Sequence, residues 1–223
     1  MPYMRFENSP LRLNMPLVLL ASASERRRQI LSEHLNDRDV LLDFYTLKEP
    51  EQEISSRMEV NLQVESSCMK KAMAAAREKS SGAENVADII LVSDTLVEDP
   101  DDIRVALGKP EDESSAAFSL IRLSGRRHRV WSSTAIVSRK IGDLEVGEGW
   151  FATIWTDYAI VEFKQLAEDE IIDLIKSRSW EGKAGGYDLG GSAGRFARVV
   201  YGEEVTVLGF SSMAIDSLND FLG

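Results

Sequence analysis

Residues 17–28 read LVLLASASERRR, an apolar run that passes through small and hydroxyl-bearing residues into a run of arginines. The apolar run from Leu17 to Ala21 predicts a short buried strand. Ser24 is a favourable N-cap for a helix, because a serine oxygen can accept a hydrogen bond from the first backbone N–H groups of that helix. Behind it, residues of one face recur at helical spacing, at Ile30, Leu31, His34 and Leu35. A strand, a short loop and a helix are therefore expected in that order.

The rest of the chain predicts a mixed α/β fold. Further strands are expected at 40–46, 89–92, 103–107, 130–137, 150–163, 195–201 and 205–210. Further helices are expected at about 64–79, 114–123, 167–177 and 212–222. Because strands and helices do not alternate regularly, we expect a mixed sheet flanked by helices. A chain of 223 residues can bury one sizeable core, as a single domain or as two tightly joined lobes.

The composition is that of a soluble protein. Hydrophobic residues make up 43% of the chain and charged residues 28%. The net charge of −11 argues against a nucleic-acid polymer as partner, because proteins that bind such polymers are usually basic. The apolar runs are shorter than the roughly eighteen residues that a membrane span needs. We therefore expect a cytoplasmic protein that binds neither a membrane nor a nucleic-acid polymer.

Cys68 is the single cysteine of the chain, which excludes a disulfide within it. The two histidines and this cysteine do not have the spacing of a zinc site. Cys68 falls in the helix expected at 64–79, and we interpret it as a packing residue.

The junction between the first strand and the first helix is a candidate anion site. The free backbone N–H groups and the dipole at a helix N-terminus favour an anion. Two hydroxyl groups and three guanidinium groups are available there, from Ser22, Ser24, Arg26, Arg27 and Arg28. Such a set can hold a polyphosphate through charge-assisted hydrogen bonds. The alternative interpretation is a capped helix with a solvated basic face.

Asp94 is a candidate catalytic or metal-binding carboxylate. It follows the apolar strand expected at 89–92, in the sequence Ser-Asp-Thr. The preceding acidic loop, which includes Glu49, can supply further oxygen ligands to a metal ion. Lys71 and Lys109 can each place a point charge on a phosphate. The alternative interpretation is an aspartate that caps a turn, with both lysines on the surface.

Residues 190–194 read GGSAG and match the nucleophile elbow of serine hydrolases. That motif requires a helix after the serine, whereas a strand is expected at 195–201. The motif also places its histidine after the serine, whereas His34 and His128 both precede Ser192. A serine hydrolase built on Ser192 is therefore a minor alternative.

Several segments together resemble the Maf family in their order and spacing. The match begins with LLASASERRR at 19–28 and continues with Lys71-Ala72, SDT at 93–95 and GKP at 108–110. It goes on with LSGRRHRV at 123–130, KAGGY at 183–187 and VLGF at 207–210. The resemblance extends from about Leu17 to the C-terminus, which implies a single catalytic domain at residues 16–223 and an N-terminal extension at residues 1–15.

This resemblance implies a fold and an activity. The implied fold is an elongated mixed sheet flanked by helices, with two lobes and a central cleft, of the Maf and inosine triphosphatase-like kind, commonly in a homodimer. The implied activity is Mg²⁺- or Mn²⁺-dependent hydrolysis of a nucleoside triphosphate to a monophosphate and pyrophosphate. The match is to the branch that prefers dTTP and UTP, so these or modified pyrimidine nucleotides are the expected substrates.

The resemblance also assigns roles by motif position. Asp94 takes the role of general base or metal ligand, and Glu49 takes a role in binding the metal. Arg26 and Thr95 match the dTTP and UTP branch, and together with position 190 they are expected to set base preference. The expected phosphate-binding residues are Ser22, Ser24, Arg27, Arg28, Lys71, Lys109 and Lys183.

Three positions depart from the usual pattern of this branch. Gly190 stands in place of a glutamine, Gly182 in place of an aspartate, and Ser211 in place of a proline. The missing glutamine removes a side chain that is expected to read the base. A nucleotide-binding regulatory protein on the same fold, with little or no turnover, is therefore the alternative to an enzyme.

Overall fold

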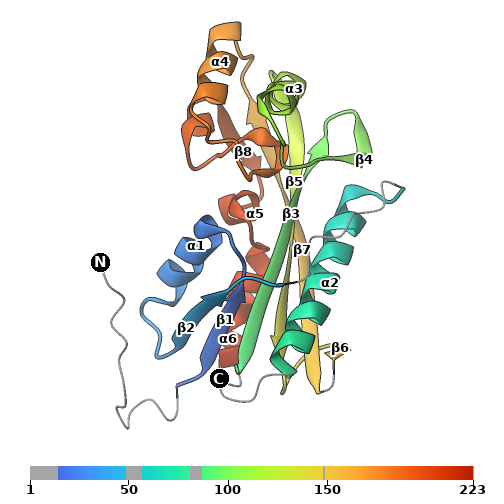
Figure 1. The fold of residues 1–223 in the computed structure, drawn as a ribbon, viewed down its shortest axis with the longest axis vertical. Helices are drawn as coiled ribbons and strands as arrows, with labels where there is room; N and C mark the ends of the chain where they lie inside the picture. The colour runs from blue at the N-terminus through green and yellow to red at the C-terminus, as the bar shows by residue number, and fades with distance from the viewer. Residues whose placement is uncertain (1–14, 49–56, 81–86, 148, 223) are drawn as a thin grey trace.

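A computed structural model of the chain describes residues 15–48, 57–80, 87–147 and 149–222 (Figure 1). Within these residues, eight strands form one sheet with helices on both of its faces. The strands are β1 (Leu17–Ala21), β2 (Leu41–Tyr45), β3 (Ile89–Asp99), β4 (Asp102–Leu107), β5 (Arg127–Ser138), β6 (Leu144–Gly147), β7 (Trp150–Phe163) and β8 (Ala197–Tyr201). The helices are α1 (Glu25–Leu35), α2 (Val60–Ser80), α3 (Glu113–Leu123), α4 (Glu168–Lys176), α5 (Glu204–Leu208) and α6 (Ser212–Leu222), with short 3₁₀ turns η2 (Ala184–Gly186) and η3 (Ser192–Arg195).

The sheet is mixed, as the sequence predicts. Its strand order is β2-β1-β3-β5-β7-β6, with β4 paired to β3 and β8 paired to β7. Strand β1 runs parallel to both β2 and β3, while the remaining pairs are antiparallel. The long strands β3, β5 and β7 run through most of the length of the molecule in Figure 1. These three strands are therefore shared by both ends of the molecule.

One half of the sheet is covered on both faces. Because side chains alternate along a strand, Val18 and Leu20 of β1 face one side while Leu19 and Ala21 face the other. Helices α1 and α6 pack on the side of Val18 and Leu20, in a cluster that includes Leu31 and Leu218. Helix α2 packs on the other side through small residues, Cys68 and three alanines among them. The buried position of Cys68 confirms the prediction that it is a packing residue.

The other half of the molecule has a core of its own. Helices α3 and α4 and the turns η2 and η3 pack there against β3, β5, β7 and β8. This cluster includes Leu120, Phe163, Leu174 and Tyr187. The two groups of helices lie at opposite ends of the long strands in Figure 1, which confirms the elongated, two-lobed α/β fold.

Most elements agree with the prediction, and β7 and α6 have the predicted bounds. The strand expected at 205–210 is wrong, because residues 204–208 form helix α5. Its β-branched residues favour a strand locally, but Glu204 suits a helix N-terminus and Gly209, with φ of 127°, ends the helix. Tertiary contacts overrule the local preference, since the Thr206 side chain is buried and its carbonyl oxygen accepts a hydrogen bond from Ser132 Oγ.

The strand expected at 89–92 is too short. Strand β3 continues to Asp99, so Asp94 lies within the strand and pairs with Ser133 of β5 instead of following the strand's end. A charged residue is tolerated there because its carboxylate has a partner on α2, as described below.

The described residues include no helix that is both long and apolar enough to cross a membrane. The predicted N-terminal extension falls almost entirely in residues 1–14, outside the described part of the chain. The division between extension and domain therefore stays a prediction.

Candidate active site

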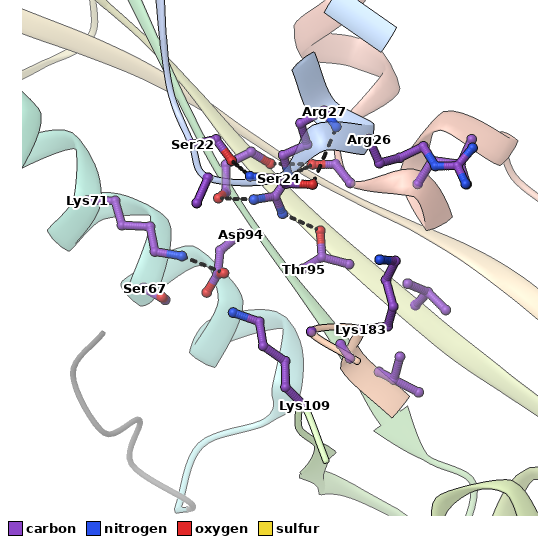
Figure 2. A pocket seen from close by; sticks show the side chains of 18 of the residues that line it. Ser22, Ser24, Arg26, Arg27, Ser67, Lys71, Asp94, Thr95, Lys109 and Lys183 are labelled. Atoms are coloured by element: carbon purple, nitrogen blue, oxygen red, sulfur yellow. Dashed lines mark hydrogen bonds and ion pairs between the residues drawn. The ribbon is translucent and has the colours of Figure 1, made fainter. Parts of the chain in front are cut away.

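A cavity of about 850 Å³ lies where β1, β3, α2 and the turns before β8 converge. Its wall contains nine of the residues predicted for the site: Ser22, Ser24, Arg26, Arg27, Lys71, Asp94, Thr95, Lys109 and Lys183 (Figure 2). In the described part of the chain, this wall has more basic than acidic side chains. The structure thus brings together residues from five separate segments of the sequence.

Asp94 and Lys71 form an ion pair inside this cavity. Lys71 Nζ lies 2.7 Å from Asp94 Oδ1, and both side chains are less than one fifth exposed. Burial by itself raises the pKa of the Asp94 carboxyl, but Lys71, a hydrogen bond from Ser67 and the charge of Arg27 outweigh it and hold the pKa below its ordinary value. Asp94 is therefore ionised at neutral pH and can accept a proton or bind a cation.

Arg27 is fixed by hydrogen bonds to three segments. Its Nε donates to Gly209 O at 2.8 Å, Nη1 to Ser93 O at 2.9 Å, and Nη2 to Thr95 Oγ1 at 2.9 Å. A Cβ atom at position 209 would lie 2.7 Å from Arg27 Nε, so glycine is required for this approach. The guanidinium group is thus a rigid positive charge in the cavity wall.

The hydroxyl group of Thr95 has a defined donor direction. Ser132 Oγ donates to the Thr206 carbonyl oxygen at 2.7 Å, so its single hydrogen is engaged. The 2.8 Å bond between Thr95 Oγ1 and Ser132 Oγ must therefore be donated by Thr95. Because Thr95 also accepts from Arg27, its oxygen can act toward a ligand only as an acceptor.

The loop between β1 and α1 is ordered by its own serines. Ser24 Oγ accepts from Arg27 N at 3.4 Å, which confirms the predicted N-cap. Ser22 Oγ accepts from Ser24 N at 3.2 Å. Both serines line the cavity at the N-terminus of α1, where a helix favours an anion.

Arg28 lies outside this cavity. Its Nε and Nη2 donate to the Ser22 carbonyl oxygen, and Nη1 donates to Glu25. Its guanidinium group also lies over the ring of Phe44 and lines a smaller neighbouring hollow. In this structure Arg28 supports the β1–α1 loop, and a phosphate contact from it stays a prediction.

Lys109 and Lys183 lie on two turns that contact each other. Gly185 N donates to Gly108 O at 3.0 Å, and this bond joins the turn after β4 to η2. Gly185 has φ of 71°, and a Cβ atom there would lie 2.8 Å from the Val97 side chain. Glycine at 185 therefore allows both lysines to line the same cavity.

The cavity wall contains three further residues that the sequence did not assign to the site. Asp188 pairs with Arg26, and Tyr187 lines the wall with its hydroxyl 2.8 Å from His128 Nε2. Ser67 of α2 hydrogen-bonds to Asp94. Its spacing of four residues from Lys71 places both on one helix face, a signal that was available from the sequence.

Position 190 is not in the cavity wall, although the sequence assigns it to base preference. Arg26 lies against Gly190 instead, as described below. Glu49 falls among residues 49–56, outside the described part of the chain.

The described residues contain no cluster of three or more histidines, cysteines and carboxylates that could hold a metal ion. Among the described residues of the cavity wall, Asp94 is a carboxylate that could bind one together with a ligand. Its ionised carboxylate has two oxygens, and the bond from Lys71 is to Oδ1. Mg²⁺ is commonly bound by one or two carboxylates together with substrate phosphates, so the site fits a metal ion that arrives with a polyphosphate.

Comparisons with known proteins find relatives along most of the chain. The sequence profile of a family described as Maf-like protein matches residues 17–219. A dTTP/UTP pyrophosphatase of Novosphingobium aromaticivorans is 34% identical over 208 residues, which cover 91% of this chain and 90% of that relative. A dTTP/UTP pyrophosphatase of Clostridioides difficile is 32% identical over 208 residues, covering 92% and 93%.

Two further matches are partial. A dTTP/UTP pyrophosphatase of Roseobacter denitrificans is 36% identical over 136 residues, which cover 60% of this chain and 65% of that relative. The solved structure of a HAM1 protein from Coxiella burnetii aligns with a TM-score of 0.40 and 14% identity, covering 67% of this chain and 73% of that one.

Proposed function

The chain belongs to the Maf-like protein family, and from this premise we propose that it is a pyrophosphatase that hydrolyses dTTP, UTP or modified pyrimidine triphosphates to a monophosphate and pyrophosphate. The relatives of similar length carry that activity in their names. The chain is accordingly a hydrolase of phosphoric anhydride bonds.

The ion pair of Asp94 and Lys71 within a basic cavity is the observation that supports this proposal most. The cavity volume of about 850 Å³ falls within the range of about 300–1,000 Å³ that is typical of small-molecule sites. Basic side chains predominate in its wall although the whole chain has a net charge of −11. A polyanion that must be attacked by a nucleophile suits a site that has several cations and an ionised carboxylate paired with one of them.

Each of these residues has a separate role in the proposed reaction. Asp94 accepts a proton from the water that attacks the α-phosphorus, opposite the bond to the pyrophosphate leaving group. Arg27 stabilises the negative charge that develops on the phosphates, and its three internal hydrogen bonds fix it before substrate arrives. Lys71, Lys109 and Lys183 provide further charge around the same space.

We also propose a divalent metal, Mg²⁺ or Mn²⁺, held by Asp94 together with phosphate oxygens of the substrate. When bound, it would neutralise phosphate charge and lower the pKa of a coordinated water. The lowered pKa of Asp94 keeps its carboxylate ionised, as either proposed role, metal ligand or base, requires. Glu49 is the predicted second ligand.

A panel of nucleotides tests the proposal. Purine and pyrimidine triphosphates are incubated with Mg²⁺, Mn²⁺ or EDTA, and the products are separated by chromatography. We expect metal-dependent release of monophosphate and pyrophosphate, with UTP and dTTP among the fastest substrates. Release of inorganic phosphate and a diphosphate would mean that a different bond is cleaved, and binding without turnover would indicate the regulatory protein.

The variant Asp94→Asn identifies the carboxylate. We expect kcat to fall by at least about 100-fold, because a general acid or base typically contributes that much. Asp216→Asn is the matched control, since it removes one exposed carboxylate on α6. Near wild-type turnover in folded Asp94→Asn protein would exclude Asp94 from catalysis.

A further inference from the structure

Arg26 is paired with a carboxylate that lies far from it in the sequence. Arg26 Nη2 lies 3.3 Å from Asp188 Oδ1 and 3.1 Å from Oδ2. Only 29% of the Arg26 side chain and 15% of the Asp188 side chain are exposed. A partly buried pair of this kind restricts the orientation of the arginine. If the guanidinium group moves away, the buried carboxylate loses a charged hydrogen bond.

The absence of a side chain at Gly190 provides the space that Arg26 occupies. A Cβ atom built at position 190 would lie 2.6 Å from Arg26 Nη1 and 2.9 Å from both Cζ and Nη2. Any larger residue at 190 would therefore displace the guanidinium group from its present position. The guanidinium group of Arg26 thus occupies the space in which a glutamine side chain at position 190 would begin.

Asp188 is itself held in place by the backbone around it. Gly190 N donates to Asp188 Oδ1 at 3.1 Å, and Gly191 N donates to Asp188 O at 3.1 Å. The preceding residue, Tyr187, is buried and hydrogen-bonded to His128. The carboxylate of Asp188 is therefore a fixed anchor for the more flexible arginine.

Arg26 and the predicted reaction centre occupy different parts of the cavity wall. Figure 2 shows the Arg26 side chain directed away from Asp94 and Lys71. If the phosphates bind beside Asp94, as the proposed function requires, the nucleoside extends toward Arg26. A guanidinium group only donates hydrogen bonds, so it favours a carbonyl oxygen on the base and disfavours an amino group.

We propose that Asp188 is a positioning residue that holds Arg26 against Gly190, and that this arrangement takes over the selection of the base from the missing glutamine. The inference rests on the proposed function for the position of the phosphates. It assigns to the Arg26–Asp188 pair a preference for bases with a carbonyl group at C4, as in uracil and thymine, over cytosine, which has an amino group there. Asp188 acts through Arg26 and does not itself contact the reacting atoms.

The test compares kcat/KM for UTP and CTP in the wild-type protein and in Asp188→Asn. Asparagine keeps the oxygen that accepts from Gly190 N but lacks the charge that holds Arg26. We expect the UTP-to-CTP ratio to fall about tenfold, the effect of weakening one hydrogen bond between charged groups. Asp216→Asn, with the same loss of charge on exposed α6, is the control and should keep the wild-type ratio.

Two further variants separate positioning from a structural role. Gly190→Ala should lower the ratio as Asp188→Asn does, because its Cβ displaces the flexible end of Arg26 and leaves Asp188 intact. In the background Arg26→Gln, Asp188→Asn should change the ratio no further. A purely structural role for Asp188 would instead lower kcat/KM for both nucleotides equally in either background.

The outcomes distinguish the inference from the proposed function. An active wild-type enzyme whose UTP-to-CTP ratio is unchanged in Asp188→Asn would overturn the inference alone. If the wild-type protein hydrolyses no nucleotide, the proposed function fails, and the ratio of UTP and CTP dissociation constants from calorimetry takes the place of kcat/KM. Equal affinities for both nucleotides, or binding of neither, would then overturn the inference as well.

Discussion

Single residues show why some departures from the family pattern are tolerated. Ser211 is fully buried, and its backbone N–H donates to Thr134 Oγ1 at 2.8 Å. Its Oγ lies 2.5 Å from Asp157 Oδ2, an interaction at the start of α6. A proline could make neither contact, because it has no N–H and no hydroxyl group. At this position the serine joins β5, β7 and α6 by hydrogen bonds.

His128 makes the stability of the protein depend on pH. Burial lowers the pKa of His128 from its ordinary value of 6.5 to about 3. The unfolded chain therefore takes up a proton below pH 6.5 that the folded protein does not accept until about pH 3. The free energy of unfolding should fall by about 2 kcal/mol between pH 7 and pH 5, as measured by urea denaturation.

The variant His128→Gln is the control for this prediction. It has no group at position 128 that titrates, so its unfolding free energy should change less over the same interval. The lowered pKa of Asp94 adds nothing there, because its stabilisation is lost only below about pH 4. Equal pH dependence in the variant and the wild-type protein would show that His128 is not the group responsible.

At the scale of elements, long periodic segments were predictable and short ones were not. The apolar patterns of β7 and α6 predict their bounds correctly, because burial of one face determines each of them. The β-branched residues at 205–207 favour a strand, whereas the contacts of this segment with β5 favour a helix. The candidate site follows the same rule: most motif residues line the cavity, whereas Asp188 was missed because only the fold brings it to Arg26.

The contact between the two lysine-bearing turns also arises from the fold. Gly185→Ala should destabilise the protein and raise KM for the nucleotide several-fold, because alanine at φ of 71° is strained and its Cβ would meet Val97 at 2.8 Å. The displaced turn would move Lys183 relative to Lys109. Thermal unfolding and steady-state kinetics measure the two effects.

Gly182→Ala is the matched control for backbone strain. Gly182 has φ of 69°, but a Cβ atom there meets nothing within 4 Å. Gly182→Ala should therefore lower the free energy of unfolding by only about 1 kcal/mol, through the strained backbone. Gly185→Ala should lower it by more. Equal losses in the two variants would mean that the contact with Val97 does not constrain the turn.

At the scale of the whole molecule, the site depends on both ends of the long strands. Lys71 and Arg27 come from helices α2 and α1 at one end, whereas Lys109 and Lys183 come from turns that pack with α3 at the other. A triphosphate in the cavity should contact both groups. Binding should therefore stabilise the molecule as a unit and depend on cations from each end.

An analogue of UTP with a methylene group between the α- and β-phosphates cannot be hydrolysed at that position. It therefore tests whether the bound ligand stabilises the protein through cations from both ends. At about 100 times its dissociation constant, with Mg²⁺ present, it should stabilise the protein by about 2.7 kcal/mol and raise Tm by roughly 5–10 °C. EDTA should reduce the increase if a metal ion binds with the phosphates. Lys71→Ala and Lys109→Ala should each reduce it at the same analogue concentration, whereas Lys140→Ala, whose side chain is 81% exposed, should not. If Lys109→Ala shows the same increase in Tm as the wild-type protein, the ligand contacts only the end that carries Lys71. Binding would then not depend on residues from both lobes.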